Sequence, residues 1–327
     1  MRTVGRMTGF VLGLVGVFGA AYGVGHLVGP IGPPVAVEHP HGGHDDPGGG
    51  HDGHGGPVGG TPGGLLVSEQ GYTLEPVTAP PGEFAFRITG PDGDAVTRYD
   101  VNHDRPMHLI VARRDLSGFR HVHPRLSEDG TWRLPTPMGD PGTWRAFADF
   151  QPTGADPLTL GVDVTVSGPV TPTPLPPPTR TVVVDGYDVT LDGGLRPGHD
   201  SRLTLTVSRD GVPVTDLEPY LGAYGHLVTL RQGDLAYLHA HPEGAPGDGR
   251  TAAGPDVTFH VAAPSPGTYR LYLDFRHGGT VRTAEFTVIA PHPDGPAPSG
   301  SVTDGPPTTA APAEPDDGHG SPGHRHD

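Results

Sequence analysis

One stretch of the chain occurs twice, and this repeat constrains the fold more than any other feature. The segment HLIVARRDLSGFRHVHP, residues 108–124, aligns without gaps with HLVTLRQGDLAYLHAHP, residues 226–242. Six of the seventeen positions are identical, and half of these identities are histidines. The matched pairs are His108 with His226, Leu109 with Leu227, Arg113 with Arg231, His121 with His239, His123 with His241, and Pro124 with Pro242. Such self-similarity predicts two copies of one structural domain.

The repeat extends beyond this segment. PGTWRAFADF, residues 141–150, matches PGTYRLYLDF, residues 266–275, after a seven-residue insertion in the second copy. Between the copies, TPTPLPPPT predicts a semi-rigid, extended spacer. We therefore predict one domain, duplicated, with boundaries that follow the composition. These are domain 1 at 65–169, a proline-rich linker at 170–180, and domain 2 at 181–290.

Within each copy the pattern is that of strands separated by turns. FAFRITGPDG and LTLTVSRDG are β-prone runs that stop at Asp-Gly. Residues 108–124 predict a hairpin around Gly118, and residues 266–290 predict another with Gly278 and Gly279 in its turn. Because no sustained 3.6-residue period occurs between 65 and 290, we expect almost no helix there. About seven short strands per hundred residues predict an all-β fold of two immunoglobulin-like β-sandwich domains.

The second copy also resembles a known class of domains. The pattern GHL, then LHxHP, then PGTYRLYLDF is similar to that of a poorly characterised class of bacterial envelope domains. The resemblance covers nearly all of the second copy and, more loosely, the first. It implies an exported, immunoglobulin-like β-sandwich that is often found near heavy-metal-handling modules.

The repeated histidines predict a metal site. His121 and His123 are two residues apart on a predicted strand, so their side chains lie on one face. His108 lies on the neighbouring strand of the same hairpin. Three imidazoles from adjacent strands provide nitrogen ligands that suit Zn(II) or Cu(II), with water or a carboxylate completing the site. We predict one triad per copy, and the second consists of His226, His239 and His241.

Four further residues are candidate accessories to these sites. Asp149 and Asp274 match each other on a later strand, where each is a candidate fourth ligand or a partner that orients an imidazole ring. Hydrogen bonding within the fold explains both residues equally well. His103 and Met107 lie close to His108 in the sequence, and the second copy has other residues at these positions. Any role of theirs is therefore confined to the first copy.

The N-terminus predicts export. Arg2 and Arg6 precede an apolar run, residues 10–28, that is about long enough to span a bilayer as a helix. Arginines on this side only predict a cytoplasmic N-terminus. We therefore expect a transmembrane helix or signal anchor at 1–30. The alternative is a cleaved signal peptide with a processing site at 19–21, and both alternatives place the remainder outside the cytoplasm, membrane-bound or secreted.

Composition describes the segments that flank the domains. Residues 31–64 and 291–327 are rich in Gly, Pro, Asp and His, with little to bury, so we expect a disordered linker and a disordered tail. Their tracts contain His39, His41, His44, His51, His54, His319, His324 and His326. Such tracts bind divalent ions weakly, or serve only as hydrophilic spacers.

Charge and residue types exclude several functions. A net charge of −16 disfavours a nucleic-acid partner, and the absence of cysteine excludes disulfides and thiolate sites. No nucleophile elbow, phosphate loop or His-Glu-x-x-His motif is present, so we expect no enzyme. The leading hypothesis is an extracytoplasmic, membrane-tethered protein that binds or buffers Cu(II) or Zn(II). The alternative is a non-catalytic interaction module of the cell envelope, with structural histidines and an unidentified protein partner.

Overall fold

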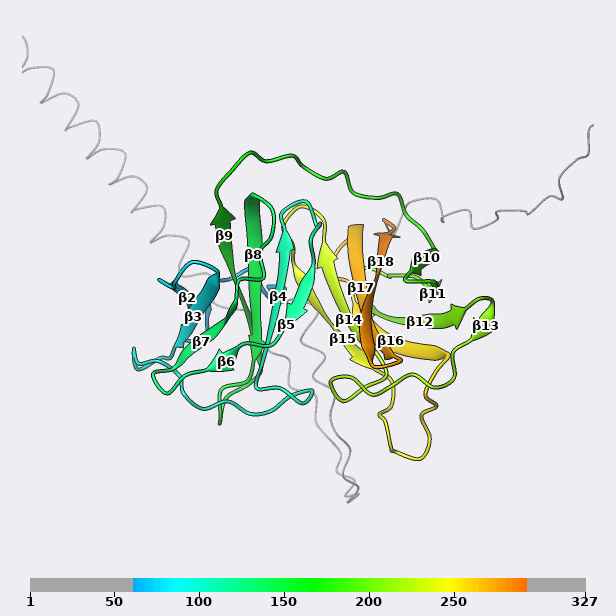
Figure 1. Cartoon of the computed structure of the whole chain (residues 1–327), viewed down its shortest axis with the longest axis horizontal. Coiled ribbons are helices and arrows are strands. Elements are labelled where there is room, and N and C mark those ends of the chain that lie inside the picture. The colour runs from blue at the N-terminus through cyan, green and yellow to red at the C-terminus, as the bar shows by residue number, and fades with distance from the viewer. Residues whose placement is uncertain (1–60, 293–327) are drawn as a thin grey trace, which may run out of the picture. The chain divides into compact units, whose positions relative to one another are not determined.

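The computed structural model describes residues 61–292, and within this range the chain forms eighteen strands and no helix (Figure 1). The all-β prediction is confirmed for these residues. Among them, no helix is long and apolar enough to cross a membrane. The predicted anchor at 1–30, most of the predicted linker at 31–64 and nearly all of the tail at 291–327 lie outside the described range.

The first copy consists of two antiparallel sheets that enclose a core. One sheet has the order β1-β2-β3-β7-β6 and the other has the order β5-β4-β8-β9. The first contains β1 (Ser68–Glu69), β2 (Tyr72–Val77), β3 (Glu83–Thr89), β7 (Thr131–Pro135) and β6 (Arg125–Leu126). The second contains β5 (Arg120–Val122), β4 (Met107–Arg113), β8 (Gly142–Phe150) and β9 (Leu158–Val166). The arrangement is sandwich-like, with Phe86, Trp132 and Leu160 among the buried core residues.

The second copy follows the same plan, but its strands form one continuous path in the order β10-β11-β12-β16-β15-β14-β17-β18. The path is continuous because β15 pairs with both β14 and β16. Its strands are β10 (Thr181–Val184), β11 (Tyr187–Gly193), β12 (Asp200–Arg209), β13 (Val212–Pro213), β14 (His226–Arg231), β15 (Tyr237–Pro242), β16 (Asp256–Ala262), β17 (Gly267–His277) and β18 (Thr280–Ala290). The short strand β13 pairs with β12 beside this path.

Both predicted hairpins are present. Strands β4 and β5 pair antiparallel, with Ile110 opposite His121, and β17 and β18 pair along their whole length. The aromatic residue near the start of each long strand is hydrogen-bonded to the loop that precedes the strand. Tyr269 donates its hydroxyl hydrogen to the Ser265 carbonyl at 2.7 Å, and Trp144 donates its indole N–H to the Asp140 carbonyl at 3.0 Å. Each ring thereby ties its strand to the preceding loop.

Strand β4 is buried along its whole length because its two faces have different partners. Side chains alternate along a strand, so Leu109 and Val111 enter the core of the first copy. Ile110 and Ala112 face the other way, into a third cluster that includes Val228 and Leu230 of the second copy. The two copies therefore pack sheet against sheet, and His108 lies on the same face of β4 as Ile110.

Aromatic pairs across this inter-copy face are reciprocal. Phe119 of the first copy stacks on Tyr272 of the second, with ring centroids 4.0 Å apart. Tyr237, which matches Phe119 in the repeat, lies 5.7 Å from Phe147, which matches Tyr272. Each contact thus occurs twice with the copies exchanged, which is the pattern of an interface with two-fold symmetry.

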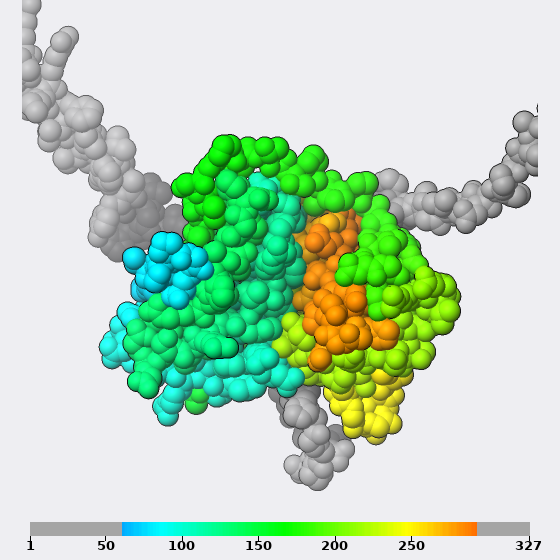
Figure 2. All heavy atoms as spheres, viewed as in Figure 1, coloured from blue at the N-terminus to red at the C-terminus, as the bar shows by residue number. Residues whose placement is uncertain are grey.

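Two connecting segments also join the copies. Gly63 forms a β-bridge with Tyr237 of the second copy, so residues 61–64, which composition places in the linker, are part of the folded structure. The proline-rich spacer crosses the boundary between the copies at the top of the view (Figure 2). Its Thr173 amide donates to Asp115 at 2.8 Å, and Leu175 packs against the inter-copy cluster.

Candidate metal centre

Strand geometry places the first histidine triad on the inter-copy face. His108 is in β4, His121 is in β5 and His123 follows β5 directly. His121 lies opposite Ile110 in the β4–β5 pair, so it shares the face that His108 and Ile110 occupy. Each residue offers a ring nitrogen, and these atoms all lie within 4.8 Å of one another. The predicted convergence of His108, His121 and His123 is therefore confirmed as geometry.

A chain of hydrogen bonds runs through the triad. The Asn102 carbonyl lies 3.0 Å from Nε2 of His108, and Nδ1 of His108 lies 3.0 Å from Nε2 of His121. Nδ1 of His121 in turn lies 3.0 Å from Oδ2 of Asp274, which belongs to the second copy. Thr283 donates its hydroxyl hydrogen to the other oxygen of Asp274. The carboxylate therefore fixes the His121 ring from the far side of the interface.

Proton positions follow from these partners. The carbonyl and the carboxylate accept hydrogen bonds, so Nε2 of His108 and Nδ1 of His121 each carry a hydrogen. The two remaining nitrogens, Nδ1 of His108 and Nε2 of His121, lie at hydrogen-bond distance, 3.0 Å apart. Either a hydrogen shared by the two nitrogens or a metal ion bound to both accounts for a contact this short. A carboxylate that orients an imidazole in this way is common behind histidines that bind a metal.

Two other ring nitrogens at this site are buried without a hydrogen-bond partner. They are Nε2 of His123 and Nε2 of His226, the first histidine of the second copy. A buried polar atom left unpaired costs about 1–3 kcal/mol. Neighbouring rings that leave lone pairs unused have the donor set that zinc and copper prefer. The residues present therefore fit a divalent transition-metal ion.

Burial keeps three of these imidazoles, His108, His123 and His226, neutral. Burial lowers the pKa of His108 to about 4, opposed by the hydrogen bond to the Asn102 carbonyl. Burial lowers the pKa of His123 to about 3, with further lowering from the neighbouring His121 and His108. The pKa of His226 lies well below its ordinary value, again chiefly because of burial. A metal binds only the deprotonated nitrogen, so these rings are available as ligands at neutral pH.

The second triad is arranged differently. Among the described residues, the only triad whose nitrogens lie within 4.8 Å of one another is that of the first copy. His226 instead lies against the first triad, with ring centroids 5.3 Å from His121 and 5.7 Å from His108. His239 and His241 are exposed. The structure thus separates the three histidines that the repeat pattern groups together.

Of the four candidate accessory residues, three lie beside histidines at the interface and one lies in the core of the first copy. Oδ2 of Asp149 lies 3.3 Å from Nε2 of His239, so both aspartates pair with a histidine of the other copy. His103 lies edge-on to His226 at 5.0 Å, from a turn in which its φ is 49°. Met107 is buried in the core of the first copy, because it points to the opposite side of β4 from His108. Met107 is therefore not available to the site.

Sequence reasoning missed that the site lies between the copies. The contributions of Asn102 and Thr283 were also unanticipated, since neither belongs to a recognisable motif. One signal was present: in β4 four apolar residues, LIVA, follow His108 without a break, which indicates a strand covered on both faces.

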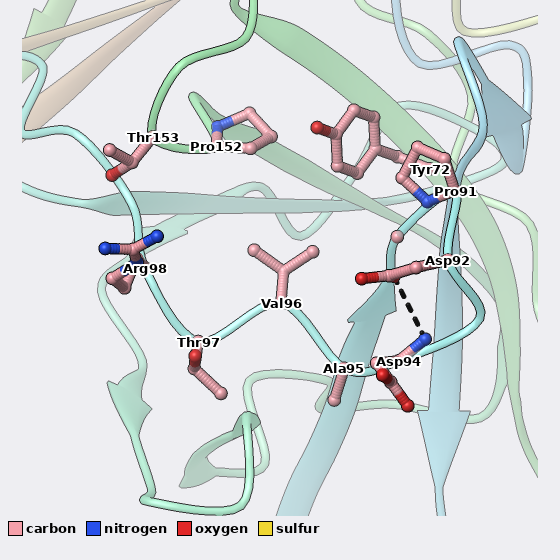
Figure 3. Close-up of a pocket in the computed structure, with 11 residues that line it drawn as sticks. Tyr72, Pro91, Asp92, Asp94, Ala95, Val96, Thr97, Arg98, Pro152 and Thr153 are labelled. Carbon is pink, nitrogen blue, oxygen red and sulfur yellow. Dashed lines mark hydrogen bonds between the residues drawn. The ribbon is translucent and has the colours of Figure 1, made fainter.

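A separate hollow of about 250 Å³ lies on the first copy (Figure 3). It is lined by the loop 90–98 together with Tyr72, Pro152 and Thr153. The carboxylate of Asp92 accepts the backbone N–H of Asp94 at 3.1 Å, so it stabilises its own turn. None of the triad histidines lines this hollow.

Two sandwich-like domains that share one histidine cluster define a duplicated all-β protein. The chain belongs to a family described as a domain of unknown function, DUF8832, whose model matches residues 69–168 and again residues 181–292. The family match therefore covers both copies separately. No curated protein matches the chain.

Solved structures resemble the chain only distantly. A DUF4426 family protein from Pseudomonas aeruginosa is 10% identical, covering 33% of this chain and 91% of its own, with a TM-score of 0.25. A protein from Corynebacterium diphtheriae described as membrane anchored is 10% identical, covering 70% and 60%, with a TM-score of 0.20. A DUF3823 family protein from Bacteroides uniformis is 16% identical, covering 61% and 94%, with a TM-score of 0.19.

Proposed function

We propose that this protein binds a divalent transition-metal ion, Cu(II) or Zn(II), through His108, His121 and His123. The observation that carries the proposal is the buried Nε2 of His123, which has no hydrogen-bond partner, beside the 3.0 Å contact between Nδ1 of His108 and Nε2 of His121. Three imidazoles, one of them fixed by a carboxylate, form a nitrogen donor set for either ion. The role is binding or buffering, without catalysis.

The proposal includes a location. Two immunoglobulin-like domains are tethered through the N-terminal segment 1–30 to the extracytoplasmic side of a membrane. The apolar sequence of that segment, preceded by Arg2 and Arg6, supports this placement. The His-rich tracts beside the domains collect ions weakly, and the triad holds one in a defined geometry.

A second candidate function has its own supporting observation. The hydrogen-bonded series His108, His121 and Asp274 joins the two copies without any metal when a proton lies between the rings. The histidines are then structural, and the domains are an interaction module. His123 distinguishes the two candidate functions. Its Nε2 takes part in no hydrogen bond, so it adds nothing to a hydrogen-bonded structural role but is free to bind a metal ion.

The test is calorimetric titration of the full chain in detergent with Zn(II) and with Cu(II). Nitrilotriacetate in the buffer competes with the weak histidine tracts and leaves only tight sites visible. We expect saturable binding that His123→Ala abolishes and that His199→Ala, at an exposed histidine elsewhere, leaves unchanged. Absence of tight binding by the unaltered chain refutes the metal proposal and favours structural histidines.

A further inference from the structure

The first histidine of the second copy lies at the site of the first copy. His226 opens β14, and it lies opposite Asp274 in the β14–β17 pair. Its ring centroid is 5.0 Å from His103, 5.3 Å from His121 and 5.7 Å from His108. All three neighbours belong to the first copy. His226 is therefore surrounded by imidazoles from across the interface.

Nε2 of His226 has no hydrogen-bond partner in this cluster. This atom is buried, as is Nε2 of His123, which also makes no hydrogen bond. By contrast, His108 and His121 have partners on both ring nitrogens. The cluster thus contains two paired and two unpaired rings, and one of the unpaired rings comes from the second copy.

The symmetry of the interface does not produce a second cluster of this kind. His239 turns to Asp149, and its side chain is 40% exposed, whereas the matching His121 side chain is 2% exposed. His241 is exposed, and it lies opposite His260 in the β15–β16 pair. In the first copy β5 ends at Val122, whereas β15 continues to Pro242 and pairs with β16. This continuation keeps His241 in a strand at the surface.

We infer that the first triad and one histidine of the second form a composite centre, in which His226 of the second copy provides the fourth nitrogen to an ion held by His108, His121 and His123. This inference rests on the proposed function and deepens it. Four imidazoles suit a tetrahedral Zn(II) or a tetragonal Cu(II). The chain then binds one ion tightly, and the ion joins the two copies, so that binding stabilises their association.

Metal binding is expected to depend on His226 and not on His241, which is the matched control in the same copy. In the full chain, with nitrilotriacetate present, we expect one tightly bound Zn(II) per chain. His226→Ala is expected to weaken binding by at least about tenfold, and His226→Phe, which keeps an aromatic ring, is expected to do the same. His241→Ala is expected to bind as the unaltered chain does. Two tight ions per chain, or equal affinities for the Ala variants at 226 and 241, overturn the inference.

A second measurement detects ligation directly. The chain has no cysteine, so His226→Cys introduces its only thiol. With Co(II) as the probe, a thiolate bound to the metal gives a near-ultraviolet charge-transfer band, and we expect this band for His226→Cys and not for His241→Cys. Co(II) binding to His226→Cys without the band overturns the inference and leaves the triad intact. If the unaltered chain binds no metal, the proposed function itself fails.

Discussion

His121 of the first copy is hydrogen-bonded to Asp274 of the second, with Nδ1 and Oδ2 3.0 Å apart. The matching residues with the copies exchanged, His239 and Asp149, also meet across the interface, but through the other ring nitrogen, with Nε2 and Oδ2 3.3 Å apart. The two pairs differ in burial, because the side chains of the first are 2% and 4% exposed and those of the second are 40% and 18% exposed. The interface thus pairs matching residues, but the two pairs differ in the ring nitrogen they use and in their exposure to solvent.

This asymmetry predicts unequal effects of the same substitution. Asp274→Asn is expected to destabilise the metal-free protein by about 1–3 kcal/mol, because it leaves a buried imidazole with a weaker partner. Asp149→Asn is expected to cost less than about 1 kcal/mol, because its partner faces solvent. Urea unfolding with a chelator present measures both values. Equal losses would show that burial of the first pair is energetically unimportant.

The aromatic stack predicts how much the interface contributes to stability. Phe119 is buried against Tyr272, so Phe119→Ala is expected to cost about 3–5 kcal/mol. Tyr272→Phe keeps the stack and removes only the 2.6 Å hydrogen bond to the Leu116 carbonyl, with an expected cost of about 1 kcal/mol. The measurement is the urea unfolding midpoint of each variant. A loss below 1 kcal/mol for Phe119→Ala would contradict a tightly packed inter-copy face.

Much of the fold was predictable because local patterns determine it. Strands such as β12 alternate, with Leu203, Leu205 and Val207 buried, and Asp-Gly or Gly-Gly pairs mark the turns. The packing of one copy on the other was not predicted, since the repeat shows two domains and says nothing about which faces meet. The uninterrupted apolar run of β4 was the available signal that a second body covers it.

The site was predictable only in part for the same reason. Period-two spacing correctly placed His121 and His123 on one face, because that inference depends on a single strand. The number of sites depends on how the copies pack. His226 approaches the first triad, and Asp274 reaches His121, only through an interface that no local pattern encodes.

The buried His108 predicts that the free energy of unfolding decreases at acidic pH. Burial lowers the pKa of His108 from 6.5 to about 4, so below pH 6.5 the unfolded chain takes up a proton that the folded chain does not. Stability contributed by this group is therefore complete above pH 6.5 and is lost as the pH falls towards 4. Between pH 7 and pH 5 the loss is about 2 kcal/mol.

The control for this effect removes the titrating ring. In His108→Asn the difference in unfolding free energy between pH 7 and pH 5, measured in urea with a chelator, is expected to shrink by that amount. Because each variant is compared with itself at two pH values, a general loss of stability does not disturb the comparison. An unchanged difference would mean that other groups cause the acid sensitivity.

A substitution at Gly161 of β9 tests whether residues 63–64, which bridge to the second copy, help to hold the copies together. A Cβ at Gly161 would lie 2.0 Å from the Gly64 carbonyl oxygen and 2.8 Å from Nε of Arg145, which itself donates to that carbonyl. Gly161→Ala is therefore expected to displace residues 63–64, to break the bridge to Tyr237 and to cost about 1–3 kcal/mol.

Gly139→Ala is the matched control, because a Cβ there meets nothing within 4 Å. Its expected effect is within about 0.5 kcal/mol. Hydrogen exchange of the Tyr237 amide, which donates to the Gly63 carbonyl at 3.0 Å, should accelerate only in Gly161→Ala. If both variants keep that amide protected, the N-terminal segment does not hold the copies together.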